Sequence, residues 1–173
     1  MTSDYEGRLN NFVGRVIIER RQGQDPVNTP MIRHWVEAMG LPPQIHLDES
    51  AARGAGREAT VAPVAMTQAW VMRGYAATMN PPTHKDGFAE LVDLLDEGGY
   101  TSVVATDSDF EFVRELVPGD VVAYEEVVES ISEEKQTGLG RGRFITTKKI
   151  YFDGSGEIIA TQLWRTLRFV PRN

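Results

Sequence analysis

Histidine is the side chain best suited to acid–base work near neutral pH, and this chain has three: His34, His46 and His84. His46 ends the segment GLPPQIH, residues 40–46, which contains no carboxylate. Asp48 follows two residues later and would point to the same side of an extended segment. Cysteine is absent, which excludes thiol nucleophiles, disulfides and cysteine zinc sites. Three separate histidines are a poor zinc set, so we predict no metal site.

The composition indicates one ordinary globular domain, residues 1–173, because 41% of the residues are hydrophobic and 25% are charged. A net charge of −7 argues against a broad nucleic-acid-binding surface. No apolar run approaches the roughly 20 residues that span a membrane. The N-terminus lacks the basic and apolar regions of a secretory signal. We therefore expect a cytoplasmic protein.

Local signals predict two helices in the first third of the chain, after a β-rich segment at residues 12–19. The first covers residues 28–39, with Thr29 as N-cap, Pro30 in its first turn and Gly40 as its stop. The second starts with Asp48 as its cap and runs to about residue 55.

Two further helices are predicted in the middle of the chain. Residues 64–78, VAMTQAWVMRGYAAT, are apolar nearly all round, which is typical of a long helix that is buried on most sides. Residues 86–97 have apolar side chains in helical phase and form a helical insertion at about residues 80–99.

The pattern changes to β-strands from Tyr100 onward, separated by turn signals rich in glycine, proline and aspartate. Short connections between the last three strands predict an antiparallel meander. The predicted strands are residues 100–106, 110–116, 121–131, 141–152 and 158–170.

This order places a hydrophobic helix between one N-terminal strand and a run of antiparallel strands. A curved antiparallel sheet wrapped around a long central helix accommodates it, which is the α+β hot dog fold. An edge strand of such a sheet commonly pairs with a second subunit.

Three segments resemble the MaoC-like hydratase and dehydratase family, in its variant with an extended N-terminal part. They are VNTPMIRHWVEAMG at residues 27–40, VAPVAM at residues 61–66 and VPGD at residues 117–120. The resemblance covers about residues 12–169 and implies hydration of trans-2-enoyl thioesters of coenzyme A, or the reverse dehydration.

The family's catalytic motif, Gly-Asp-x-Asn-Pro-Ile/Leu-His, is only partly kept. Gly40, Ile45 and His46 match it, whereas Leu41 stands at the aspartate position and residues 43–44 replace the Asn-Pro pair. The resemblance implies that Asp and His share the protons of one water, and a leucine cannot take part. His46 therefore reads as a remnant of the catalytic histidine.

A degenerate motif resembles one subunit of the heteromeric enoyl-CoA hydratases of bacterial steroid (cholesterol) side-chain degradation. That resemblance implies a non-catalytic or weakly catalytic chain that forms the acyl pocket and the interface. A second MaoC-like subunit with an intact Asp/His motif would complete a heterotetramer. The substrate would be a bulky coenzyme A thioester, with no further cofactor, nucleic acid or membrane.

The resemblance also implies roles for other residues. Backbone N–H groups at the start of the 64–78 helix, at Val64 and Ala65, would face the thioester oxygen, assisted by the helix dipole. The expected contacts to coenzyme A are Arg141, Arg143, Lys148 and Lys149. The expected lining of the acyl pocket is Trp70, Met72, Leu91 and Leu95.

Three alternatives stay open at this point. The chain is a stand-alone homodimeric hydratase or dehydratase that uses His46, with Asp48 in place of the missing aspartate. Alternatively it binds acyl-CoA as a scaffold without turnover. A thioesterase is less compatible, because the 64–78 helix offers Gln68 and no acid.

Overall fold

The computed structural model describes residues 2–80 and 84–172. In this part of the chain one antiparallel sheet has neighbouring strands in the order β1-β3-β5-β6-β2, with the short β4 paired to β5. Its strands are β1 (Val16–Gln22), β2 (Ser102–Phe112), β3 (Ala123–Ile131), β4 (Lys135–Gln136), β5 (Gly140–Phe152) and β6 (Ile158–Pro171). The predicted antiparallel meander is confirmed, because β3, β5 and β6 are adjacent in the sheet.

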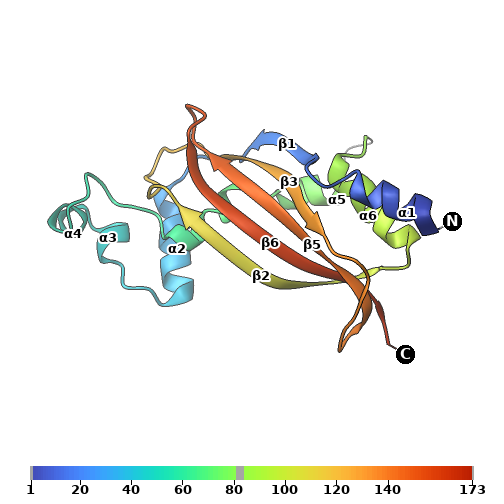
Figure 1. Ribbon diagram of the computed structural model, residues 1–173. Coiled ribbons are helices and arrows are strands. Elements are labelled where there is room, and N and C mark those ends of the chain that lie inside the picture. Colours follow the sequence, from blue (N-terminus) through green and yellow to red (C-terminus); the bar gives the residue numbers. More distant parts are fainter. Residues whose placement is uncertain (1, 81–83, 173) are drawn as a thin grey trace.

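The helices lie at two ends of the sheet (Figure 1): α2, α3 and α4 at one end, α1 and α6 at the other. The α-helices are α1 (Thr2–Asn10), α2 (Thr29–Met39), α3 (Gln44–Leu47), α4 (Glu49–Gly54), α5 (Tyr75–Met79) and α6 (Gly87–Glu97). Two 3-10 turns, η1 (Val64–Met66) and η2 (Ala69–Val71), connect the two ends. We refer to α2, α3, α4 and their connections, residues 29–54, as the helical cap.

Local signals fix the cap helices nearly as predicted. The N-cap of α2 is Asn28 rather than Thr29, because the Asn28 side chain accepts a hydrogen bond from the Met31 backbone N–H at 3.0 Å. Gly40 ends α2 in the left-handed conformation, with φ 62°. Asp48 caps α4 as predicted, accepting from the backbone N–H groups of Ser50 and Ala51.

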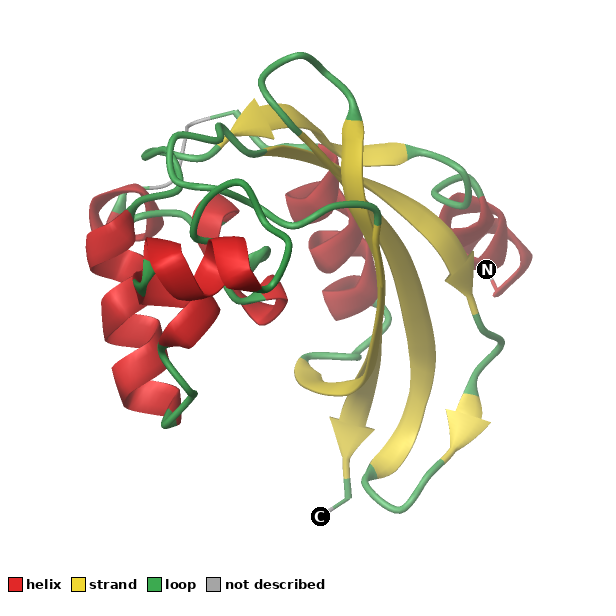
Figure 2. Cartoon of the chain, turned by 90° about the vertical axis from the view of Figure 1, so that its left-hand side faces the viewer, coloured by secondary structure: helices red, strands yellow, loops and turns green. Residues whose placement is uncertain are grey.

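The helix predicted within residues 80–99 is α6, which begins at an Asp86 cap; residues 81–83 of that range lie outside the described residues. Its Leu91 and Leu95 are buried. A Cβ on Gly87 would lie 2.9 Å from Ile17 Cα, so the start of α6 packs directly on the backbone of β1. Figure 2 shows the sheet curving around α6, which partly fills its concave side. The helix predicted at residues 64–78 does not fill it.

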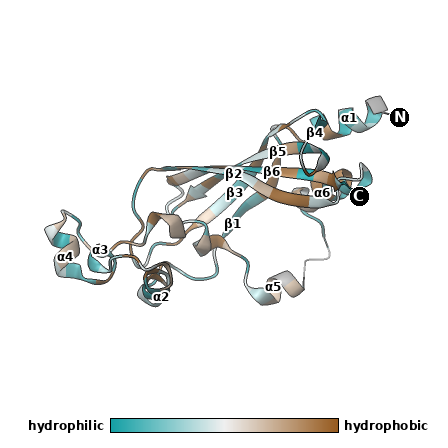
Figure 3. Ribbon diagram, turned by 90° about the horizontal axis from the view of Figure 1, so that it is seen from below, coloured by the Kyte–Doolittle hydropathy of each residue, from teal (hydrophilic) through white to brown (hydrophobic). Residues whose placement is uncertain are grey.

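The prediction of one long helix over residues 64–78 is wrong. The segment forms η1, η2 and the five-residue α5, interrupted at Met72 and Gly74, both of which have extended ψ angles. The Thr67 hydroxyl donates to the Val64 carbonyl, and this local bond favours the tighter turn. Figure 3 shows α5 standing away from the sheet, and Tyr75 on it is exposed.

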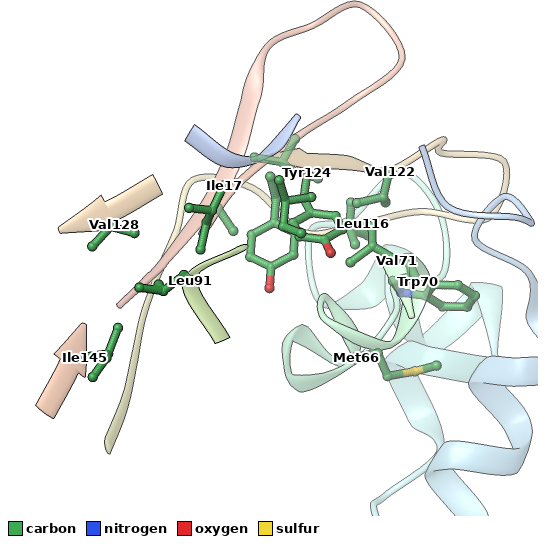
Figure 4. Close-up of a cluster of buried hydrophobic side chains, with 14 of the residues drawn as sticks. Ile17, Met66, Trp70, Val71, Leu91, Leu116, Val122, Tyr124, Val128 and Ile145 are labelled. Carbon is green, nitrogen blue, oxygen red and sulfur yellow. The ribbon is translucent and has the colours of Figure 1, made fainter. Parts of the chain in front are cut away.

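The two strands predicted at residues 100–106 and 110–116 are one strand, β2, because a register shift between Ala105 and Asp107 absorbs the expected break. The buried side chains form one cluster that joins the sheet to α1, α2, η1, η2 and α6. In Figure 4, Leu91 and Ile145 lie on one side of this cluster, and Met66 and Trp70 lie on the other, with Tyr124 between them.

Candidate functional site

The motif residue His46 lies in the helical cap, in the single-turn helix α3. Its ring Nδ1 is 2.7 Å from the backbone carbonyl oxygen of Val61, so this nitrogen carries the proton and donates to the carbonyl. Asp48 is committed to capping α4. In the described part of the chain, no hydrogen bond or ion pair joins His46 to a carboxylate. His46 therefore forms no Asp/His pair with the described residues.

Leu41, at the position of the family's aspartate, serves the packing of the cap. Its backbone N–H donates to the Val36 carbonyl at 2.9 Å, which closes the end of α2. Its side chain packs against the buried cluster. The first part of GLPPQIH, residues 40–43, thus connects α2 to α3, and its last three residues belong to α3.

Val64 and Ala65 belong to η1, a three-residue 3-10 turn, and Val64 is 42% exposed. The predicted support from the dipole of a long helix is wrong, because a single turn has few aligned peptide groups. A contact between these N–H groups and a thioester oxygen stays a prediction without that support.

The four basic residues predicted to contact coenzyme A do not cluster. Arg141 pairs with Glu134 at 2.6 Å. Arg143 is buried and bonded to the Tyr100 hydroxyl, the Ser132 carbonyl and Glu6. Lys148 and Lys149 lie on opposite faces of β5, because adjacent residues of a strand alternate. Arg143 is therefore a structural residue, and contacts of the others with coenzyme A stay predictions.

A large hollow lies between α6 and the concave face of the sheet and has a volume of about 800 Å³. We call it the sheet cavity. It reaches from Ile18 on β1 to Val103 on the edge strand β2. Its helical wall is apolar and consists of Phe88, Ala89, Leu91, Val92 and Leu95. Cavities of this size and character hold drug-sized ligands.

Two of the four predicted acyl-pocket residues, Leu91 and Leu95, line the sheet cavity. Trp70 is instead buried in the hydrophobic cluster. Met72 is 65% exposed and borders two smaller hollows beside the cavity. Leu91 and Leu95 were predicted correctly from the helical periodicity of residues 86–97. The prediction for Trp70 and Met72 assumed a long helix over residues 64–78, which does not form.

Sequence reasoning missed the sheet's contribution to the cavity. The floor includes Ile145, Thr147 and Lys149, alternate residues of β5, and Trp164 and Thr166 of β6. Their cross-strand pairs, Thr147 with Trp164 and Ile145 with Thr166, place them side by side. The alternation of β5 was the available signal, but it does not reveal which face is concave.

The floor of the cavity carries charge. Glu126 is only 6% exposed, and its Oε1 accepts a hydrogen bond from the Thr147 hydroxyl at 2.6 Å. The Lys149 ammonium lies 5.3 Å from the centre of the Trp164 ring. Burial lowers the pKa of Lys149, an effect that the nearby Glu126 partly offsets. A buried charge in an apolar cavity is a feature of binding sites.

Within the described residues, no three His, Asp or Glu side chains are grouped so as to hold a metal ion. None of the described helices is long and apolar enough to cross a membrane.

Two curated relatives of this chain are named as hydratase subunits. The chain is 64% identical over 169 residues to the "probable enoyl-CoA hydratase alpha subunit" of Thermomonospora curvata, covering 98% of this chain and 53% of the relative. It is 39% identical over 151 residues to the "3-oxo-4,17-pregnadiene-20-carboxyl-CoA hydratase alpha subunit" of Mycobacterium tuberculosis, covering 87% of this chain and 47% of the relative. The chain thus spans about half the length of these relatives.

A solved structure agrees with them. A chain in the crystal structure of the ChsH1-ChsH2 complex from Mycobacterium tuberculosis matches with a TM-score of 0.88 and 35% identity, over 100% of this chain and 95% of the other. The predicted α+β hot dog fold is thereby confirmed. Residues 11–162 match the family described as "FAS1-like, dehydratase domain region". The chain therefore belongs to the FAS1-like dehydratase family of MaoC-like hot dog proteins.

Proposed function

We propose that this chain is the pocket- and interface-forming part of a heteromeric enoyl-CoA hydratase that acts on a bulky, steroid-type 2-enoyl-CoA. The observation that carries the proposal is the separation of motif and cavity. The chain has a large apolar hollow in its sheet, but its only motif histidine is hydrogen-bonded to Val61 and has no carboxylate partner among the described residues. Such a chain holds an acyl group and leaves acid–base chemistry to another subunit.

Hydration adds the oxygen of water to the β-carbon and a proton to the α-carbon of the thioester, with no change of redox state. An acid and a base must therefore move two protons, and loss of one partner typically costs about 10²–10⁴ in rate. We assign both groups to a second MaoC-like subunit with an intact Asp/His motif. The coenzyme A thioester is the substrate, and the reaction needs no further cofactor.

The edge strand β2 is where we place the partner. In the described part of the chain, β2 pairs only with β6, and most of its residues are exposed. Val103 is 57% exposed on this strand and Phe112 is 41% exposed. The opposite edge, β1, is packed by the start of α6. An unpaired edge strand favours pairing with another chain.

The relatives support this assignment. Two are named as hydratase alpha subunits, one of them for a steroid-type acyl-CoA, and the similar crystal structure is a complex of two proteins. Alpha subunits in these names imply companion subunits, as the cavity without an acid–base pair does.

The test is hydration of a steroid enoyl-CoA, followed by loss of enoyl absorbance. The chain is assayed alone and then with a candidate partner that carries the intact motif. We expect turnover only in the mixture, with His46→Ala equal to wild type and to the control His34→Ala. Turnover by the chain alone, lost in His46→Ala, would overturn the proposal in favour of a stand-alone hydratase. Tight binding of acyl-CoA with no turnover in any mixture would indicate a scaffold instead.

A further inference from the structure

The edge strand β2 carries three carboxylates on one face, and we call Asp107, Asp109 and Glu111 the acidic row. They alternate along the strand, and all three are exposed. The residues between them point to the face of the sheet cavity, because Ser108 pairs with Trp164 of the cavity floor. The acidic row therefore lies on the convex face, at the edge of the sheet where β6 is the only pairing strand of the described chain.

The chain itself neutralises little of this charge. Asp107 forms an ion pair with Arg165 at 3.5 Å, and both side chains are about half exposed, so water screens the interaction. Among the described residues, Asp109 and Glu111 form no ion pair within 4.0 Å. Their cross-strand neighbours on β6 are a leucine and a threonine. Most of the charge of the acidic row is therefore available to an incoming strand.

The rest of the β2 edge favours association. Phe110 and Phe112 stack on the cavity side with ring centroids 5.2 Å apart, and Phe112 remains 41% exposed. Val103 and Val104 are also exposed. The 11 residues of β2 offer backbone N–H and C=O groups along the open edge. Any incoming strand would gain these contacts, so the charge on the convex face is what discriminates between one strand and another.

A second copy of this chain is a poor occupant of this edge. A two-fold axis perpendicular to the sheet pairs β2 with itself antiparallel, and full-length pairing then places the acidic rows of both copies on one face. Like charges on neighbouring strands are destabilising, and the net charge of −7 adds to the repulsion. A strand with lysine or arginine at alternate positions of that face would form opposite-charge pairs instead.

We propose that the acidic row makes β2 select a partner strand with basic side chains on the convex face over a second copy of this chain. This inference rests on the proposed function for the presence of a partner subunit at β2. The acidic row then favours the assembly of two different subunits over the assembly of like subunits. Charges on an edge strand also protect against aggregation, but that role by itself predicts no preference for a basic partner.

A charge-reversed copy of this chain provides a basic strand that is otherwise identical. It carries Asp107→Lys, Asp109→Lys and Glu111→Lys, and it is mixed with the wild-type chain. Analytical ultracentrifugation with one copy fluorescently labelled gives the dissociation constants of the mixed and like pairs. Opposite-charge pairs predict roughly 3- to 100-fold tighter association of the mixed pair than of wild type with itself. Raising the salt concentration from about 0.05 M to about 0.5 M should remove most of this preference.

The same property is measured with the candidate partner subunit that carries the intact Asp/His motif. Neutralising the acidic row by Asp107→Asn, Asp109→Asn and Glu111→Gln should weaken this complex by about 10-fold. It should also make association of the variant with itself tighter than that of wild type. All three positions are exposed, so the substitutions leave the hydrophobic core untouched.

The matched control removes three negative charges at exposed positions away from β2, by Asp25→Asn, Glu37→Gln and Glu58→Gln. It should equal wild type in both measurements. Equal affinity of wild type for itself and for the charge-reversed copy would overturn the inference. A neutralised row that behaves like the control toward the candidate partner would overturn it as well.

The two proposals fail separately, because the charge-reversed copy requires no hydratase partner. Preference for that copy, with no binding of the candidate partner, overturns the two-subunit enzyme of the proposed function and leaves the inference about the acidic row. Turnover by a two-subunit complex whose affinity and salt dependence are the same with and without the acidic row overturns the inference and leaves the function.

Discussion

The helical cap and the sheet cavity differ in how their polar groups are satisfied. The cap holds the segment in which the family keeps its catalytic motif, but Leu41 packs into the core and His46 bonds to the Val61 carbonyl. The cavity contains no motif, yet its floor holds Lys149 without a hydrogen-bond acceptor and Glu126 buried beside it. In the cap, polar groups are satisfied internally. In the cavity, Lys149 has no hydrogen-bond acceptor among the described residues, and because of this difference we place the proposed acyl group in the cavity and not in the cap.

We expect the largest effect on activity from a substitution that fills the sheet cavity. Ala89 lines the helical wall of the cavity, so Ala89→Trp places an indole in the space proposed for the acyl rings. We expect kcat/KM of the two-subunit enzyme to fall by about 100-fold or more for a steroid enoyl-CoA, and much less for a four-carbon enoyl-CoA. Ala38→Trp, on the exposed side of α2 in the cap, is the control. Equal losses with both esters would show that the cavity is not the acyl site.

A second prediction contrasts how tightly the two regions are packed. Gly87→Ala brings a Cβ to 2.9 Å from Ile17 Cα, where α6 packs on β1. It should lower the free energy of unfolding by about 1–3 kcal/mol. Gly54→Ala in the cap helix α4 meets nothing within 4 Å, and should raise it by up to about 1 kcal/mol. Urea denaturation of both variants measures this, and a tolerated Gly87→Ala would contradict the close packing of α6 on β1.

A third prediction concerns the motif histidine. His46→Phe leaves the Val61 carbonyl without its donor and should cost about 1 kcal/mol, which corresponds to about 2–4 °C in Tm for a chain of this size. Hydration by the complex should stay unchanged. His34→Phe, at an exposed position of α2, controls for the substitution itself. A fall in kcat with unchanged Tm would make His46 a working residue and break the contrast between the two regions.

The smallest expected effect is a pH dependence. The pKa of Lys149 is lower in the folded chain than in the unfolded chain. Between the two pKa values the unfolded state binds more protons, so this group makes stability rise with pH in that window. Lys149→Met removes the free-energy cost of burying this positive charge. Its Tm relative to wild type should be highest near pH 7 and fall, by an amount on the order of 1 °C, as the pH approaches the usual lysine pKa of about 10.4. A Tm difference that is constant between pH 7 and 10 would indicate that Lys149 is fully solvated.

Several elements followed from the sequence because their signals are local. The caps Asp48 and Asp86 and the stop at Gly40 act within a few residues, and the helices that they bound were predicted correctly. The meander of β3, β5 and β6 followed from short turns between apolar runs. The departure of GLPPQIH from the family's motif was also visible directly, because a leucine at the aspartate position cannot transfer a proton in any fold.

Other features depended on contacts between distant residues. Residues 64–78 have the composition of a buried helix, but the backbone of Trp70 passes within reach of Gly23, where a Cβ would lie 2.0 Å from the Trp70 carbonyl oxygen. That close crossing favours two short turns instead of a continuous helix. Arg143 and Lys149 are both basic residues of β5. The Arg143 side chain is hydrogen-bonded to Tyr100 and Glu6, whereas Lys149 faces the sheet cavity.

The sequence by itself therefore determined the fold class, the capped helices and the departure from the family's Asp/His motif, since each depends on residue type or on neighbours a few positions away. Only the tertiary structure decided that α6 would lie over the concave face, that a hollow of about 800 Å³ would remain beneath it, and that Lys149 would point into that hollow without an acceptor. The curvature of the sheet and the path of residues 64–78 set these outcomes, because both arise from packing between segments that are far apart along the chain.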